Sequence, residues 1–418
     1  MSKKLVLVIL NITISVMGFG QMSTEKVYFS NGNLNAIGPI SENKQREGSW
    51  FFYSVQDTIS NIEDKIPVGI GQYSKGREIG EWKSFDAKNA HLNRIIKYFP
   101  KNTIDTKFYS FKDYYSTGNI REEGLVLNNF QEGESKKYYW NGVIESKGTY
   151  SKGKKNGLLT FYFKENGELK SKQNYKNGKK DGVYVLMGAD QKITIEGNYL
   201  NDDKIGDWNH YKNGKLEMYQ NFKTSNTYSE IAYYDNDNIK YKRNFNNGNH
   251  VGKWLYFFEN GEIVNETNFN DEGKWNGKRK VYRENGNLKS EMDFDNGNSL
   301  SSNEYFENGA IQKKCISKEE LLECKTYLEN GKLSRFSIYN KTKKENKSSK
   351  VFDENENIIS SCSLNKEGYN ICTFFDNDGK KIRIESYKNG KKHGDWFYYK
   401  PDGTLKLKAV MKNGIKIE

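Results

Sequence analysis

Cysteine and histidine are the residue types in this chain best suited to chemistry, because both bind metals and a cysteine thiolate is a nucleophile. The sequence has four of each: Cys315, Cys324, Cys362 and Cys372, with His91, His210, His250 and His393. No two cysteines have the Cys-x-x-Cys spacing of a zinc site, and no histidine lies near them in sequence. We therefore expect no metal site, and we predict no cofactor.

Motifs for enzyme chemistry are also missing from the sequence. It has no His-Glu-x-x-His, no glycine loop that opens a helix and cradles phosphate, and no Gly-x-Ser-x-Gly. Acidic residues are scattered through turns, whereas a general acid needs surroundings that shift its pKa. We therefore expect a protein that is not an enzyme, with no catalytic or cofactor-binding residues.

A repeated sequence motif shows which structural elements position these residues. Its halves are clearest at 148–157 and 174–182, and at 252–263 and 394–405. The glycine of Asn-Gly-x-Leu, or its replacement, recurs in steps of 22 to 25 residues, at 118, 142, 167, 191, 214, 237, 261, 286, 309, 331, 356, 379 and 403. Gln191, Asp237 and Glu356 replace the glycine without breaking the frame. A fixed period of this length indicates a repeat array.

Each period predicts two strands joined by glycine turns. Asn260-Gly261 favours a type I′ hairpin turn, which needs positive φ at both central positions, and a longer Lys-Asn-Gly-Lys-Lys-Asp-Gly turn follows each second strand. Aromatic residues point to both faces of the first strand, which favours one layer. The predicted fold is all-β: an elongated, twisted, mostly single-layer antiparallel meander of about 15 β-hairpin repeats of 22–25 residues. The repeat-structural residues are Trp50, Trp82, Trp208, Trp254, Trp396, Gly142, Gly167, Gly214, Gly261, Gly286 and Gly403.

The chain begins with a predicted signal peptide, residues 1–20. Lys3 and Lys4 precede an apolar stretch that begins at Leu5, and small residues precede a cleavage site near Gly20/Gln21. Irregular repeats are predicted for 21–117, and the regular array for 118–418. The expected location is outside the cytoplasm, in the periplasm, at the cell surface or secreted.

The repeat frame pairs the cysteines. Cys315 and Cys362 each lie six residues after a marker, and Cys324 and Cys372 each lie seven before one. These positions face each other across a hairpin, so we predict the disulfides Cys315–Cys324 and Cys362–Cys372. An oxidising compartment permits them, and closing a loop of about ten residues contributes roughly 2–3 kcal/mol on the chain-entropy model.

The charge leaves two interpretations open. The formal net charge is +12, and many lysines lie in the predicted turns. They could form a basic stripe for an anionic surface, or they could be solvated turns that protect a thin sheet from edge-to-edge aggregation. Export makes nucleic acid an unexpected partner.

The pattern Tyr-x-x-Gly-x-x-x-Gly followed by Trp-x-Tyr-Tyr-x-x-Asn-Gly-x-Leu resembles the bacterial variant of the MORN repeat, over about residues 28–418. The resemblance implies an array of β-hairpins that serves as a binding or scaffolding module, and some bacterial members carry an antitoxin label. The sequence is also similar to the aromatic repeats of cell-wall-binding proteins.

Together these features predict a non-catalytic repeat protein that binds an unknown protein partner, as a recognition or scaffolding module at the cell envelope or outside the cell. One alternative is a binder of an anionic cell-surface polysaccharide or of a membrane surface. The other alternative is an antitoxin or immunity-like protein.

Overall fold

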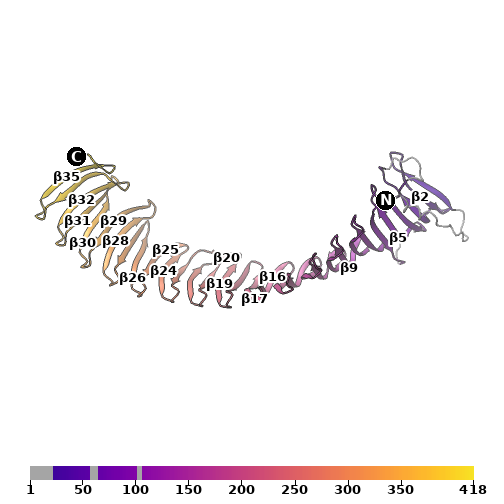
Figure 1. The fold of residues 1–418 in the computed structure, drawn as a ribbon, viewed down its shortest axis with the longest axis horizontal. Coiled ribbons are helices and arrows are strands. Elements are labelled where there is room, and N and C mark those ends of the chain that lie inside the picture. The colour runs from indigo at the N-terminus through magenta and orange to yellow at the C-terminus, as the bar shows by residue number, and fades with distance from the viewer. Residues whose placement is uncertain (1–21, 57–64, 101–105) are drawn as a thin grey trace. The chain divides into compact units, whose positions relative to one another are not determined.

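The computed structural model describes residues 22–56, 65–100 and 106–418. Within these ranges every regular element is a strand, and the strands form one open antiparallel sheet of 36 strands, a meander of hairpins (Figure 1). The predicted all-β meander of hairpins is confirmed. A search of the described residues for helices long and apolar enough to cross a membrane finds none. The predicted signal peptide and its cleavage site at Gly20/Gln21 lie outside the described residues.

The chain divides into two compact units, residues 1–204 and residues 205–418. The strands of the first unit are β1 (Ser23–Tyr28), β2 (Leu34–Ile40), β3 (Gly48–Phe52), β4 (Gly69–Ser74), β5 (Arg77–Phe85), β6 (Leu92–Tyr98), β7 (Phe108–Tyr114), β8 (Ile120–Leu127), β9 (Phe130–Tyr138), β10 (Ile144–Ser151), β11 (Lys154–Lys155), β12 (Gly157–Tyr162), β13 (Leu169–Lys176), β14 (Lys179–Met187) and β15 (Ile193–Leu200).

The strands that follow are β16 (Asp203–Lys212), β17 (Lys215–Thr224), β18 (Thr227–Tyr233), β19 (Ile239–Asn246), β20 (Asn249–His250), β21 (Gly252–Phe257), β22 (Ile263–Phe269), β23 (Gly277–Tyr282), β24 (Leu288–Asp295), β25 (Asn298–Tyr305), β26 (Ile311–Lys318), β27 (Leu321–Tyr327), β28 (Leu333–Asn340), β29 (Glu345–Phe352), β30 (Ile358–Leu364), β31 (Asn370–Phe375), β32 (Lys381–Lys388), β33 (Lys391–Lys392), β34 (Gly394–Tyr399), β35 (Leu405–Lys412) and β36 (Ile415–Lys416).

The turn at Asn260-Gly261 differs from the predicted type I′ geometry. Only Gly261 has positive φ, at 91°. Its N–H donates to the Phe258 carbonyl, and the Phe258 N–H donates to the Glu262 carbonyl at 2.8 Å. This is a three-residue loop in which a left-handed glycine forms a bulge. The Asn260 side chain accepts from the Glu262 N–H at 2.9 Å, so the asparagine stabilises the loop without adopting left-handed geometry itself.

Type I′ geometry occurs instead in the lysine-rich turn. Asn177 and Gly178 have φ of 52° and 90°, and Lys176 pairs directly with Lys179 across them. The turn is therefore a two-residue loop whose twist matches that of the flanking strands. The second glycine of this phrase, Gly182, has φ of 100° and belongs to the following strand. The predicted single long turn is thus a tight turn plus a separate irregularity in the strand.

Packing in the first unit centres on a small cluster of buried residues, Ala36, Trp50 and Tyr73, with Phe52 and Trp82 packed against it. The Trp50 ring lies over Gly38, where an added Cβ would come within 2.4 Å of the ring. A glycine on the neighbouring strand therefore makes room for the indole, and the two strands can pair at normal spacing.

Candidate functional site

The strand register defines one face in each unit, here called the aromatic face. In the first unit it carries Trp50 and Trp82, and in the second Trp208, Trp254 and Trp396. All but the half-buried Trp82 are buried. The indole N–H groups of Trp50, Trp254 and Trp396 each donate at 3.0 Å to the carbonyls of Pro39, Asn244 and Ser386. These hydrogen bonds link the three indole rings to the preceding strand. Because the rings are also buried, little of their surface is available to a ligand.

The marker glycines of the sequence frame lie in turns. Positive φ, between 74° and 91°, is found at Gly142, Gly167, Gly214, Gly261, Gly286 and Gly403. The replacements Gln191, Asp237 and Glu356 also adopt positive φ, of 58°, 67° and 64°. The backbone conformation is thus retained where the glycine is lost, at a steric cost to an L-residue.

The cysteines are paired as the frame predicts. Cys315 lies directly opposite Cys324, and Cys362 opposite Cys372. The sulfur atoms are 2.06 Å and 2.16 Å apart, which fits two disulfide bonds. Both pairs lie on the aromatic face. Cys324 and Cys372 stand at the frame position that tryptophan occupies in other repeats, and Cys315 and Cys372 are buried.

His250 and His393 occupy turn-side positions, whereas His210 lies within β16, where its Nε2 is 3.2 Å from Gln220 Oε1. His250 is exposed in β20, and its ring centroid lies 4.2 Å from that of Trp254. His393 is beside Asn413, with Nδ1 3.3 Å from Oδ1. Within the described residues, no group of three or more His, Cys, Asp or Glu side chains could hold a metal ion.

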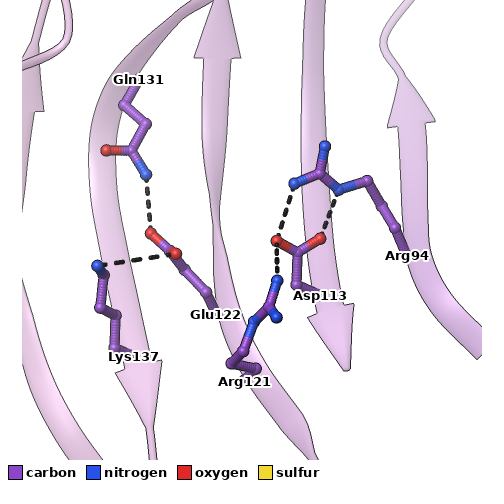
Figure 2. A network of polar contacts seen from close by, with 6 residues as sticks. All are labelled: Arg94, Asp113, Arg121, Glu122, Gln131 and Lys137. Carbon is purple, nitrogen blue, oxygen red and sulfur yellow. Dashed lines mark hydrogen bonds and ion pairs between the residues drawn. The ribbon is translucent and has the colours of Figure 1, made fainter. Parts of the chain in front are cut away.

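A charged ladder crosses four strands of the aromatic face in the first unit (Figure 2). The Arg94 guanidinium on β6 donates twice to the Asp113 carboxylate on β7, with Nη2 2.8 Å from Oδ2. Arg121 on β8 donates to the same oxygen at 3.3 Å. Glu122 accepts from the Gln131 amide at 2.9 Å and lies 3.9 Å from the Lys137 ammonium on β9.

The ladder combines a buried acid with half-exposed bases. The Asp113 side chain is 6% exposed, whereas those of Arg94 and Arg121 are 48% and 54% exposed. Burial opposes the Asp113 charge, but hydrogen bonds from Arg94 and Arg121 outweigh it and hold the pKa of Asp113 below its usual value. The hydrogen bond to Asp113 raises the pKa of Arg94. The carboxylate thus fixes two guanidinium groups at the surface.

A second ladder, in the other unit, also joins a buried carboxylate to a guanidinium group. The Gln220 amide donates to the buried Glu230 carboxylate at 2.9 Å, and Arg243 Nε donates to it at 2.8 Å. The Arg243 guanidinium also lies over the Tyr241 ring, 3.9 Å from its centroid. Although burial opposes the Arg243 charge, Glu230 holds the pKa of Arg243 above its usual value.

A third arrangement, here called the Lys–Tyr column, consists of Tyr150, Lys155, Tyr175, Lys180 and Tyr199 in the first unit. Lys155 pairs in register with Tyr150, and Lys180 with Tyr175. Each ammonium lies 4.7 Å from the ring centroid of the next tyrosine, Lys155 over Tyr175 and Lys180 over Tyr199. Cations and aromatic rings therefore alternate along the sheet.

The aromatic face of the first unit also contains a shallow hollow of about 340 Å³. Aromatic rings of Phe52, Tyr73 and Trp82 line it, together with Ser84 and Arg94. Its mixture of aromatic and guanidinium surface suits binding through stacking and hydrogen bonds. The sequence frame located the tryptophans, the turn glycines and the cysteines, but it did not single out either ladder or the column.

The fold and its repeated turns define a class of repeat protein built from β-hairpins. The MORN repeat variant matches five stretches of the chain, residues 131–152, 157–177, 251–271, 275–296 and 392–413. These matches support a MORN-repeat protein. A comparison with curated proteins found no match.

Among solved structures, the chain is similar to those described as "Crystal Structure of TcdB2-TccC3-Cdc42" and "Crystal Structure of TcdB2-TccC3-TEV", and to a Photorhabdus luminescens Tc holotoxin pore. Identity is 12% in each case, and the TM-scores are 0.16, 0.15 and 0.16 respectively. The matches cover 93% of this chain but only 23% of those chains. At these TM-scores the likeness carries no argument about fold or function.

Proposed function

We propose that the protein is a non-catalytic repeat protein that binds another protein, as a recognition or scaffolding module at the cell envelope or outside the cell. The ladder of Arg94, Asp113 and Arg121 carries this proposal. It holds two half-exposed guanidinium groups in fixed positions, with that of Arg94 over the Phe111 ring, and arginine and aromatic residues are enriched in protein interfaces. Groups that are already ordered lose less entropy on binding.

Two further observations support the proposal. The chain matches the MORN repeat variant in five stretches, and resemblance to that repeat implies a binding or scaffolding array. The two cysteine pairs fit disulfide bonds, which persist in oxidising compartments such as the periplasm or the extracellular space. The two cysteine pairs therefore favour export.

Affinity capture tests this function. The tagged protein is exposed to the solubilised envelope fraction and to the culture medium, and the captured protein is identified, purified and titrated against the wild type. We expect one protein to bind with defined stoichiometry at both about 0.1 M and about 0.5 M salt, because a packed interface is screened less than exposed charges. Capture of no protein from either fraction would contradict the proposal.

Matched variants then locate the interface. Arg121→Gln removes one guanidinium from the aromatic face and leaves Arg94 on Asp113, whereas Lys172→Gln removes the same charge from the opposite face of β13. We expect Arg121→Gln to weaken binding several-fold, the order expected of a rim charge, and Lys172→Gln to have no effect. If the two substitutions weakened binding equally, the ladder would not be part of the interface.

An anionic polysaccharide or membrane surface is a second candidate partner. Residues 150–180 contain nine lysines and two glutamates. Binding of this kind depends on exposed charge, so it would fall steeply between the same two salt concentrations.

A further inference from the structure

The Lys–Tyr column lies in the most basic part of the described chain. Nine lysines and two glutamates give residues 150–180 a net charge of +7, against +12 for the whole sequence. Such a concentration of one sign raises the local potential and attracts an oppositely charged partner. Within this segment, Lys155 and Lys180 are the column's two cations.

Lys155 and Lys180 differ from the arginines of the two ladders in how their charge is held. In the part of the chain that the structure describes, neither ammonium is within ion-pair distance of a carboxylate. Asp202 is close to Lys180, but its carboxylate accepts from the backbone N–H, at 2.8 Å. The ammonium groups instead lie on tyrosine rings. A cation–π contact orders the side chain and leaves the positive charge uncompensated.

The spacing of these cations follows from the fold. Each repeat adds two strands, and neighbouring strands are about 4.8 Å apart, so equivalent residues recur every ~9.6 Å along the sheet. Lys204 continues the series in sequence, because it stands two residues before Gly206, as Lys155 and Lys180 stand two residues before Gly157 and Gly182. Three cations therefore follow one another with the period of the repeat.

We propose, building on the protein-binding function above, that the Lys–Tyr column is a docking surface for an extended acidic peptide segment in the polyproline II conformation, with a carboxylate at every third residue. Such a helix has three residues per turn and rises about 3.1 Å per residue, so one of its edges presents a side chain every ~9.3 Å. The difference from the cation period is about 0.3 Å per repeat, well within the reach of a lysine side chain.

Other peptide conformations fit the column less well. In a β-strand, side chains on one face recur every ~6.8 Å, and the next multiple is ~13.6 Å. In an α-helix, residues seven apart recur every ~10.5 Å, so the mismatch grows by about 0.9 Å per repeat. The tyrosine rings between the lysines add a second criterion, because polyproline II segments dock on aromatic-lined grooves through their proline rings.

Synthetic peptides test the proposal with the full-length protein. The probe is a fluorescent peptide of four Glu-Pro-Pro units, and the control is six Glu-Pro units, which has more charge but spaces it at every second residue. We expect saturable binding of the first peptide, and at least about fivefold weaker binding of the second despite its greater charge, since its carboxylates recur every ~6.2 Å. Equal or tighter binding of the control peptide overturns the proposal.

Variants of the column assign the site. Lys155→Gln with Lys180→Gln is expected to raise the Kd about tenfold, equivalent to ~1.4 kcal/mol, while Lys155→Arg with Lys180→Arg binds as the wild type. The matched control is Lys172→Gln with Lys192→Gln, which removes the same charge from the opposite face of β13 and from a lysine paired with Asp190. Equal weakening by the control pair, or loss of binding in the arginine pair, overturns the assignment.

Further ligands separate this inference from the protein-binding function. Sulfated dextran and vesicles rich in phosphatidylglycerol are titrated in the same way as the Glu-Pro-Pro peptide. Tighter binding of either one than of the peptide overturns the peptide assignment. A natural protein captured equally by the wild type and by Lys155→Gln with Lys180→Gln overturns only the column's role. If no protein is captured but the peptide still binds at the Lys–Tyr column, the result counts against the proposed protein-binding function and not against the peptide site.

Discussion

Substituting Gly38 by alanine tests whether contact between neighbouring strands determines stability in this sheet. The φ of Gly38 lies outside the left-handed region, so an alanine there is not strained by the backbone, and its effect is steric. The added Cβ would lie 2.4–2.5 Å from three atoms of the Trp50 ring. That ring is 0% exposed and its N–H is bonded to Pro39, so it has little freedom to move.

The magnitude follows from two opposing terms. Overpacking costs about 1–3 kcal/mol, and this contact is at the upper end because a fixed ring opposes it. Replacing glycine by alanine stabilises by about 0.4–1 kcal/mol through the unfolded chain. We expect a net loss of about 2 kcal/mol, which accelerates amide exchange in β2 and β3 by roughly 30-fold.

Hydrogen exchange followed by mass spectrometry is the appropriate assay, because a repeat array opens locally and lacks one global transition. Strands β21–β24 serve as the internal control and should exchange as in the wild type. In a Trp50→Leu background the clash is absent, so Gly38→Ala should be neutral or slightly protective. Unchanged exchange of β2 and β3, or the same loss in both backgrounds, would refute the reasoning.

Three further predictions concern other contacts. Replacing Cys315 and Cys324 by serine should cost roughly 2–3 kcal/mol and speed exchange in β26 and β27, and the unreduced wild type should show no free thiol by mass spectrometry; four alkylated cysteines would contradict it. Because the pKa of Asp113 is lowered in the folded protein, its contribution is present above the unfolded pKa of about 3.9 and is lost as pH falls through the folded value. Asp113→Asn should therefore destabilise β6–β8 by about 1–2 kcal/mol at neutral pH, and its difference from the wild type should shrink on acidification; a constant difference would contradict it. Asp237→Gly should stabilise the turn after β18 by up to about 1 kcal/mol, because φ is 67° there and the Asp237 carboxylate forms an exposed ion pair with Lys215, at 3.7 Å, that contributes little; a lower melting temperature would count against it.

The sequence predicted the strand order well, because among the described residues pairing is local along the chain and most turns carry a glycine. The cysteine pairing followed from the same frame, since Cys315 and Cys324 occupy facing positions of one hairpin. The turn types were assigned less well. Asn-Gly occurs in both turns, and whether the asparagine becomes left-handed depends on the register of the flanking strands, which Asn177 and Asn260 do not reveal locally.

The charged ladders were missed for a different reason. Arg94 and Asp113 are 19 residues apart and meet only across strands. A signal was present in the frame. Asp113 and Glu122 lie five residues before and four residues after marker 118, and Lys137 lies five residues before marker 142, so these positions face each other in neighbouring strands. Charged residues at facing positions of three neighbouring strands predict a ladder. Its burial could not be predicted, since it depends on the aromatic rings packed around it.

The disulfides have a mechanical consequence. Under a pulling force, hairpins that are held only by their neighbours can be released one after another, and a repeat of about 24 residues adds roughly 80 Å of extended chain at 3.3–3.6 Å per residue. The Cys315–Cys324 link, with a sequence separation of 9, withholds about 30 Å of that length. Cys362–Cys372, with a separation of 10, withholds a similar amount. In an oxidising medium these two hairpins therefore yield less length than the others, and reduction restores the difference.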